Sequence, residues 1–266
     1  MISHSSLLHL SDILTHPILP ITWDIVHFLP SRRRCVIYGE YGALKTWLLL
    51  DMALHLVIGE PWLGHEVPLP KSVLFIDEEM AEEDLRRRLK LLADGLPQLH
   101  GEPKFAALSR AGVTFDTYGA LKLLKLLENQ QFNPDIVIVE SFTRVMPGNE
   151  NLAGEVAAFW RNLEPISREK TLVMSHHMSK PQDTPRDVRN RARGSVDILA
   201  GSDVAWALLI GEPGKTTEMV CVKQRSEEMG RGFTVQLQAD ALDSSVRLSR
   251  ARDQKSPEPS FLNFSC

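Results

Sequence analysis

Cysteine is scarce in this sequence. Only three occur in 266 residues, at positions 35, 221 and 266, and no two of them are closely spaced. A disulfide framework or a zinc site needs cysteines in pairs, so neither is expected. Scattered cysteines are typical of a reducing compartment. We therefore predict a cytoplasmic protein.

A surplus of positive charge and a long apolar run are also missing. The formal net charge is −4, which excludes a generally cationic nucleic-acid binder and requires a local patch for any such contact. Asp51 and His55 interrupt the most apolar stretch before it could span a bilayer. No signal peptide, internal repeat or low-complexity segment is recognised. We expect a globular protein with no membrane contact.

The most informative stretch is residues 35–47, CVIYGEYGALKTW. A short β-branched and aromatic run ends at Gly39, a loop with Gly42 follows, and Lys45-Thr46 begins a long apolar helix. Backbone N–H groups at such a helix start attract polyphosphates. A lysine there can contact the β- and γ-phosphates, and a threonine hydroxyl can bind Mg²⁺.

The stretch departs from the G-x-x-x-x-G-K-[ST] pattern at one position, because Leu44 replaces the last glycine. A left-handed Leu44 would cost about 1–2 kcal/mol, which a folded domain can tolerate. The alternative is an ordinary turn with an incidental lysine. The predicted nucleotide contacts are Gly39, Glu40, Tyr41, Gly42, Ala43, Leu44, Lys45, Thr46 and Trp47.

Apolar strands and helices alternate along the chain. Strands are expected near 36–38, 73–76, 136–139, 171–174 and 204–210, and helices near 45–58, 119–130 and 153–164. This order predicts an α/β protein whose mostly parallel sheet has helices on both faces. Residues 219–222 and 233–237 are expected to form antiparallel edge strands. We expect a lead-in at 1–34, one domain at 35–250 and a tail at 251–266.

Reactive side chains follow four of these strands. They are the phosphate loop, Glu79, Glu140 with Ser141, and His177. In parallel sheets ligands bind beyond the carboxyl ends of the strands, so we expect these groups on one rim. His176 and His177 are adjacent on a strand and face opposite sides, which counts against a shared metal site.

The chain resembles the RecA-like ATPases, most closely the plasmid RepA-type helicase branch of AAA-family ATPases. The matching stretches are GEYGALKTW, FIDEEM, IVIVESFTRVMPGNENLAGEVAAFW, VMSHHMSKP, RARGSVDILAGSDVAWAL and VKQR. They span residues 35–237. The resemblance implies a RecA-like three-layer fold that uses ATP and Mg²⁺.

The resemblance also implies residue roles. Lys45 and Thr46 would bind phosphate and Mg²⁺, and Glu79 would orient or deprotonate the attacking water. Glu140 stands where the family usually has aspartate at the second magnesium position, which puts fast turnover in doubt. His177 would sense the γ-phosphate.

Two further roles depend on neighbouring molecules. In ring-forming relatives a basic pair like Lys223 and Arg225 reaches the neighbouring subunit's nucleotide, and Arg193 is a competing candidate. A solvated strand edge is the alternative for either. The segments at 142–154 and 179–193 correspond to DNA-facing loops. The predicted nucleic-acid contacts are Lys180, Arg186, Arg189, Arg191 and Arg193.

Three functions remain open from the sequence. The first is a ring-forming, hexameric, helicase-like ATPase on single-stranded DNA, in replication or mobile-element maintenance. The second is an ATPase that regulates a protein assembly. The third, indicated by Leu44 and Glu140, is a nucleotide-binding module that hydrolyses little.

Overall fold

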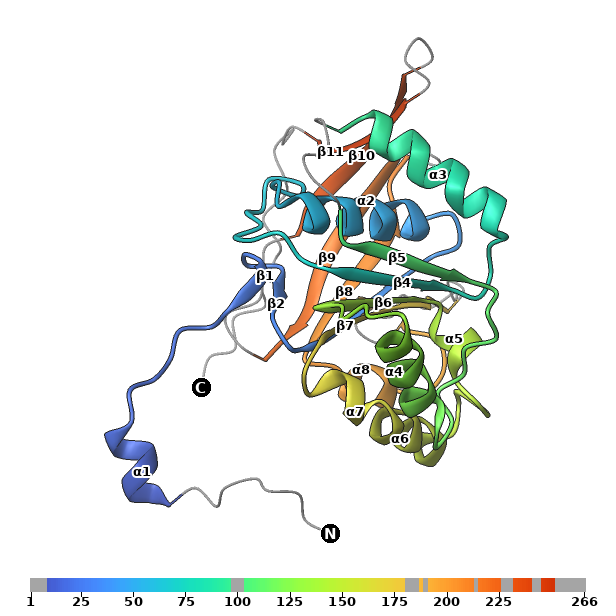
Figure 1. The fold of residues 1–266 in the computed structure, drawn as a ribbon. Coiled ribbons are helices and arrows are strands. Elements are labelled where there is room, and N and C mark those ends of the chain that lie inside the picture. The colour runs from blue at the N-terminus through green and yellow to red at the C-terminus, as the bar shows by residue number, and fades with distance from the viewer. Residues whose placement is uncertain are drawn as a thin grey trace.

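A nine-stranded sheet organises the protein, in the order β11-β10-β9-β8-β3-β7-β6-β4-β5 (Figure 1). The computed structural model describes residues 9–96, 103–179, 187–188, 191–212, 215–225, 232–240 and 245–251. The strands from β8 through β5 run parallel, and β9, β10 and β11 add antiparallel pairs at one edge. The sequence predicted this mostly parallel sheet with antiparallel edge strands.

The elements of the sheet and its helices have the following bounds. The sheet strands are β3 (Arg34–Gly39), β4 (Val73–Asp77), β5 (Phe105–Ser109), β6 (Ile136–Glu140), β7 (Thr171–His177), β8 (Val204–Ile210), β9 (Thr216–Gln224), β10 (Phe233–Asp240) and β11 (Ser245–Arg250). The helices are α1 (Leu10–Thr15), α2 (Lys45–Ile58), α3 (Glu82–Asp94), α4 (Gly119–Asn129), α5 (Phe142–Val145), α6 (Ala153–Asn162), α7 (Glu164–Ser167) and α8 (Asp197–Ala200).

Helices cover both faces of the sheet, which makes three layers (Figure 1). One core cluster joins α2 and α3 to one face, and the other joins α4, α6 and the opposite face. Strands β4 and β6 are buried at every position. Strands covered on both sides read as continuous apolar runs, which is why the sequence identified them.

Residues 23–30 lie within the stretch expected to be a lead-in, yet they pack into the domain. They form the two-stranded β1 (Trp23–Ile25) and β2 (Leu29–Pro30). Phe28 is fully buried and stacks on Trp206, with the ring centroids 4.5 Å apart. Only α1 stands away from the sheet and has no buried residue (Figure 1). Of the tail expected at 251–266, all but Ala251 lies outside the described residues.

No helix in the described part of the chain is long and apolar enough to cross a membrane.

Candidate nucleotide site

The loop after β3 is shaped by two glycines. Gly39 lies so close to β8 that an added Cβ would be 2.6 Å from Leu208 Cβ, so no side chain fits there. Gly42 has φ +84°, a conformation that costs glycine little. These two positions fix the turn that brings the chain to the start of α2.

Leu44 adopts the left-handed conformation, with φ +59°, immediately before α2. Glycine would adopt it freely, whereas a residue with a Cβ pays about 1–2 kcal/mol. Its carbonyl still accepts the first helical hydrogen bond, from Leu48 N at 2.9 Å. The loop therefore keeps its helix start without the final glycine.

Lys45 turns its ammonium back into the loop. Nζ donates to Gly39 O at 3.0 Å and to Glu40 O at 2.8 Å, and the side chain is buried. Burial lowers the pKa of Lys45, while the carboxylates of Glu140 and Glu79 oppose that shift. Both present acceptors are neutral carbonyls. A phosphate oxygen is a stronger acceptor because the hydrogen bond becomes charge-assisted on both sides.

Thr46 and Glu140 meet beside the loop, since Thr46 Oγ1 donates to Glu140 Oε1 at 3.1 Å. Glu140 is buried, and within the described residues its second oxygen, Oε2, has no hydrogen-bond partner. Asp77 Oδ2 is also buried without a hydrogen-bond partner among the described residues. Burial and the neighbouring Asp77 raise the pKa of Glu140 to about 7. Carboxylate oxygens that are buried without partners indicate a place for a cation or an ordered water.

The described residues contain no group of three or more His, Cys, Asp or Glu side chains that could hold a metal by themselves. Mg²⁺ in phosphate-transfer sites needs fewer, because it keeps water molecules and binds phosphate oxygens. The Thr46 hydroxyl with the unpartnered oxygen of Glu140 fits that donor set. Glu140 thus reaches the Thr46 hydroxyl, although its side chain is one methylene longer than the aspartate that the sequence resemblance implies.

Glu79 is surrounded by three donors or cations. Ser141 Oγ donates to Glu79 Oε1 at 2.7 Å, Arg144 Nε lies 3.5 Å away and His177 Nε2 lies 3.8 Å away. His177, followed by Ser141 and then the charge of Arg144, lowers the pKa of Glu79 to about 2, against a smaller opposing effect of burial. Glu79 is therefore an anion at any ordinary pH.

The neighbouring Glu78 faces elsewhere. Its carboxylate accepts from Gly112 N at 3.0 Å and Val113 N at 2.8 Å, so it fastens the loop after β5. From that loop Arg110 donates through Nε and Nη2 to Glu79 O, at 2.9 and 2.7 Å. Only Glu79 of the two points at the rim of the sheet.

The two histidines that end β7 face opposite sides, as the alternation of a strand predicts. His176 is fully buried, lies 2.6 Å from Arg193 O through Nε2 and packs edge-on against Phe142. Burial lowers the pKa of His176 to about 4, so it is neutral. His177 faces Glu79 and is about one-third exposed.

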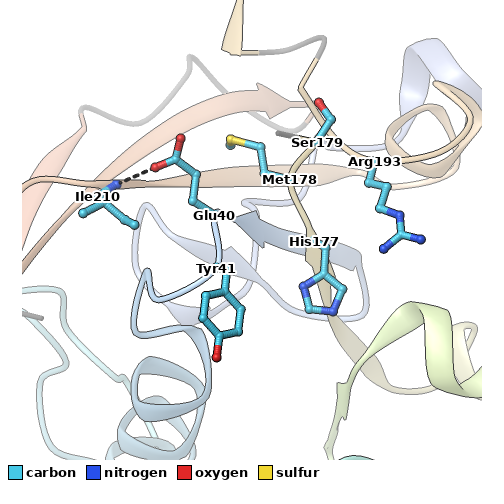
Figure 2. A pocket seen from close by; sticks show the side chains of 7 residues that line it. All are labelled: Glu40, Tyr41, His177, Met178, Ser179, Arg193 and Ile210. Carbon is cyan, nitrogen blue, oxygen red and sulfur yellow. Dashed lines mark hydrogen bonds between the residues drawn. The ribbon is translucent and has the colours of Figure 1, made fainter. Parts of the chain in front are cut away.

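A cavity of about 740 Å³ lies between the phosphate loop and the end of β7 (Figure 2). It is lined by Glu40, Tyr41, His177, Met178, Ser179, Arg193 and Ile210. Glu40 accepts from Ile210 N at 3.2 Å and pairs with Arg191 at 2.5 Å. Tyr41 is almost entirely exposed. The cavity therefore adjoins the candidate site, with which it shares His177 and the loop residues Glu40 and Tyr41.

The structure describes two of the five residues predicted to contact nucleic acid. Arg191 forms an ion pair with Glu40 and is mostly buried. Arg193 forms an ion pair with Glu150 at 2.9 Å and is about half exposed. Lys180, Arg186 and Arg189 lie outside the described residues.

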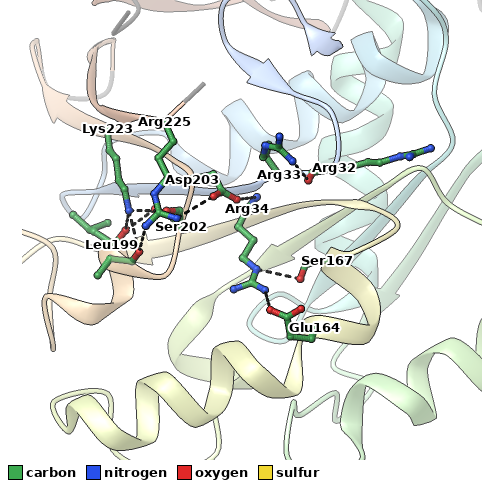
Figure 3. Close-up of polar contacts among 11 residues, drawn as sticks. Arg32, Arg33, Arg34, Glu164, Ser167, Leu199, Ser202, Asp203, Lys223 and Arg225 are labelled. Atoms are coloured by element: carbon green, nitrogen blue, oxygen red, sulfur yellow. Dashed lines mark hydrogen bonds and ion pairs between the residues drawn. The ribbon is translucent and has the colours of Figure 1, made fainter. Parts of the chain in front are cut away.

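Lys223 and Arg225 lie at the other end of the sheet (Figure 3). Lys223 pairs in register with Ala205, at the start of β8, whereas the phosphate loop lies beyond its end. Lys223 Nζ donates to three carbonyls that follow or end α8, those of Leu199, Ala200 and Ser202, at 2.5, 3.0 and 2.6 Å. Arg225 pairs with Asp203 at 3.3 Å and is about half exposed. Neither can reach the phosphate loop of its own chain.

Thr46, Glu79, Glu140, Ser141 and His177 thus gather at one rim with Lys45. The sequence interpretation missed Arg110 and Arg144. Arg144 lies four positions after Glu140 in the sequence. A single arginine in a short turn matches no motif or periodicity that would indicate a role. Arg110 follows β5, in which no residue is buried.

The sequence matches the AAA domain family over residues 4–183. The chain belongs to this family. No curated protein matches the sequence. Among solved structures it is similar to one titled "The Structure Of A DnaB-Like Replicative Helicase And Its Interactions With Primase", with a TM-score of 0.58 and 16% sequence identity. The match covers 81% of this chain and 58% of that one, so the chain spans little more than half the helicase's length. At this identity the likeness establishes the RecA-like fold alone.

Proposed function

We propose that this AAA-family protein binds ATP with Mg²⁺ at the Gly39–Trp47 loop and hydrolyses it. The single observation that carries this is the gathering of Lys45, the Thr46–Glu140 pair and anionic Glu79 at one rim of the sheet. Phosphoryl transfer asks the protein mainly to position the water and to stabilise charge. Lys45 supplies charge for the phosphates, and Glu79 orients the attacking water with Ser141 and His177 fixing its carboxylate.

Mg²⁺ would be held by the Thr46 hydroxyl and Glu140 together with phosphate oxygens, and it would neutralise charge on the phosphates. The pKa of Glu140, raised to about 7 by burial, leaves this carboxyl partly protonated near neutrality. A bound cation favours the ionised form, so cation binding and proton release are linked there.

We further propose that the protein assembles into a ring, as a hexamer, in which Arg225 contacts the neighbouring subunit's nucleotide. Arg225 lies at the end of the sheet opposite the phosphate loop and is 57% exposed. Lys223 is less suited, because its ammonium already donates to three carbonyls at the end of α8. In this arrangement Lys223 holds the element from which Arg225 projects.

A mixing experiment tests the role in trans. Arg225→Ala subunits added to wild-type protein should reduce ATPase activity by more than their share, because each one leaves a neighbouring site without its arginine. Arg86→Ala, which removes an exposed arginine on α3, is the matched control and should only dilute the activity. Simple dilution by Arg225→Ala would remove Arg225 from this role.

We propose single-stranded DNA as the substrate on which the ring acts, in replication or mobile-element maintenance. Support comes from the fold shared with a DnaB-like replicative helicase and from the arginine-rich segment that follows β7. Of that segment, Arg193 is half exposed beside the cavity. A cationic segment of this kind can follow a phosphate backbone.

An ATPase assay with and without single-stranded DNA, run beside light scattering, tests the whole proposal. We expect Mg²⁺-dependent hydrolysis, stimulation by single-stranded DNA and a mass of six subunits. Absence of nucleotide binding would overturn the proposal, whereas hydrolysis without stimulation would leave an ATPase that regulates a protein assembly.

A weakly hydrolysing nucleotide-binding module is the second candidate. The observation that favours it is the state of Glu79, whose carboxylate is already held by Ser141, Arg144 and His177. Tight ATP binding without measurable steady-state turnover would select this candidate.

A further inference from the structure

Arg144 lies beside the carboxylate that we propose orients the attacking water. It belongs to α5, the single turn that follows β6, and its Nε is 3.5 Å from Glu79 Oε1. Lys45 and this arginine reach the rim from different elements, Lys45 from the first position of α2 and Arg144 from α5. The site therefore has a second cation of its own chain within reach of the outermost phosphate.

The backbone under Arg144 is firmly held. Phe142 and Val145, on either side of it in the turn, are fully buried. Phe142 packs edge-on against Phe159 with the ring centroids 4.6 Å apart, and Thr143 Oγ1 donates to Glu150 at 2.7 Å. With these neighbours fixed inward, Arg144 is directed outward over the rim from a rigid base.

The guanidinium itself is loosely bound. Its side chain is 62% exposed, and 3.5 Å is an ion-pair distance rather than a good hydrogen bond. Exposed pairs of this kind contribute little to stability. By contrast, Ser141 donates to the same carboxylate oxygen at 2.7 Å. Arg144 can therefore leave Glu79 at little cost, while Ser141 keeps the carboxylate in place.

A terminal phosphate is the better partner for this guanidinium. It carries more charge than a carboxylate and offers oxygens that a guanidinium can grip in pairs. Lys45 would contact the β- and γ-phosphates and Thr46 their Mg²⁺, which puts the terminal phosphate next to Glu79, Ser141 and His177. We propose that Arg144 binds the γ-phosphate in cis, exchanging Glu79 for it, and so makes the site discriminate ATP from ADP.

This inference rests on the proposed nucleotide site and adds a consequence for Glu79. In the structure the charge of Arg144 helps to keep the carboxylate ionised and engaged. When the guanidinium moves to the phosphate, Glu79 loses one of its three partners and is freer to accept a hydrogen bond from water. Binding of the triphosphate would thus free the Glu79 carboxylate to orient the water that attacks it.

Affinities for ATP and ADP of the full chain, measured by fluorescent-analogue competition, test the inference. Arg144→Gln should weaken ATP binding about 10- to 100-fold, the worth of one charge-assisted contact, and leave ADP binding within about twofold. Arg144→Lys keeps the positive charge but lacks the paired donors of the guanidinium. Its affinity for ATP should therefore lie between those of wild type and Arg144→Gln. Arg86→Gln, an exposed arginine paired with Glu82 on α3, should change neither affinity.

The outcomes separate the inference from the proposed function. If wild-type protein binds ATP and ADP but Arg144→Gln weakens both equally or neither, the γ-phosphate contact is refuted while the nucleotide site stands. If wild-type protein binds no nucleotide, the proposed function fails and the inference with it. A thermal-unfolding midpoint equal to wild type shows that each variant is folded, and Arg144→Lys serves as the second test.

Discussion

Charged groups at the two ends of the sheet differ in whether their buried polar atoms have hydrogen-bond partners. At the carboxyl end, Glu140 Oε2 and Asp77 Oδ2 are buried without hydrogen-bond partners in the described structure. At the amino end, Lys223 makes three hydrogen bonds to carbonyls. There Arg34 donates to Ser167 and pairs with Glu164, so its guanidinium is also held by partners (Figure 3).

This difference separates a binding site from a scaffold. A buried polar atom without a partner costs about 1–3 kcal/mol, so it persists where a ligand, ion or water completes it. Satisfied charges at the amino end need no ligand and stabilise the fold. The same residue types therefore serve two purposes: the buried carboxylates at the carboxyl end keep oxygens without partners, whereas the charges of Lys223 and Arg34 are paired.

The largest effect should distinguish the two adjacent glutamates at the carboxyl end. Glu79→Gln should lower kcat about 10²- to 10⁴-fold, as for loss of a general base, with ATP binding kept. Glu78→Gln makes the same chemical change one position earlier, where the carboxylate only holds Gly112 and Val113. It should lower the unfolding midpoint and leave kcat within a few-fold. Equal kcat losses would move the base role away from Glu79.

A pair of lysines compares the two ends directly. Lys45→Ala should weaken ATP binding about 10- to 100-fold by removing a charge-assisted contact. Lys223→Ala should leave ATP binding unchanged and cost about 1–3 kcal/mol of unfolding free energy, because three carbonyls lose their donor. Calorimetric ATP titration and urea unfolding measure the two quantities. Unchanged affinity in Lys45→Ala would refute the loop assignment.

Much of this arrangement was predictable from the sequence. The apolar runs of β4, β6 and β7 and the apolar helix α2 identified the sheet, and the parallel-sheet rule put Glu79, Glu140 and His177 at one edge. β5 was missed because its apolar run is short, from Phe105 to Leu108, and none of its five residues is buried. Arg110 and Arg144 were missed because their roles depend on contacts with Glu79 across the chain, which no local spacing reveals.

The third effect is a pH dependence. The pKa of Glu140 is raised to about 7 by burial, so the carboxyl is protonated below that pH and cannot bind a cation. Apparent Mg²⁺ affinity of the ATP complex should fall about tenfold per unit as pH drops below 7, since one proton competes with the cation.

Mg²⁺ titrations between pH 5.5 and 8.5 measure that dependence. Glu140→Gln should bind Mg²⁺ more weakly, and it should lose the part of the pH dependence that comes from protonation of Glu140. Because phosphate groups also titrate near pH 6, the difference between variants is decisive. Asp51→Asn is the control, since Asp51 also has a pKa raised to about 7 by burial but is bonded to Trp62 and lies within α2. It should keep the wild-type dependence.

The smallest effect concerns Leu44, the residue that departs from the phosphate-loop pattern. Two contributions oppose each other there: its left-handed backbone is strained, while its side chain packs partly against the core. Leu44→Ala removes the packing and keeps the strain, whereas Leu44→Gly removes both. Leu44→Gly should therefore be more stable than Leu44→Ala by about 1 kcal/mol, less the stability lost because glycine has more conformational entropy in the unfolded state. Urea unfolding measures the difference, and both variants should bind ATP within about threefold of wild type if the loop owes its shape to Gly39 and Gly42. If Leu44→Ala is the more stable, the left-handed strain at this position is smaller than the conformational entropy that glycine loses on folding.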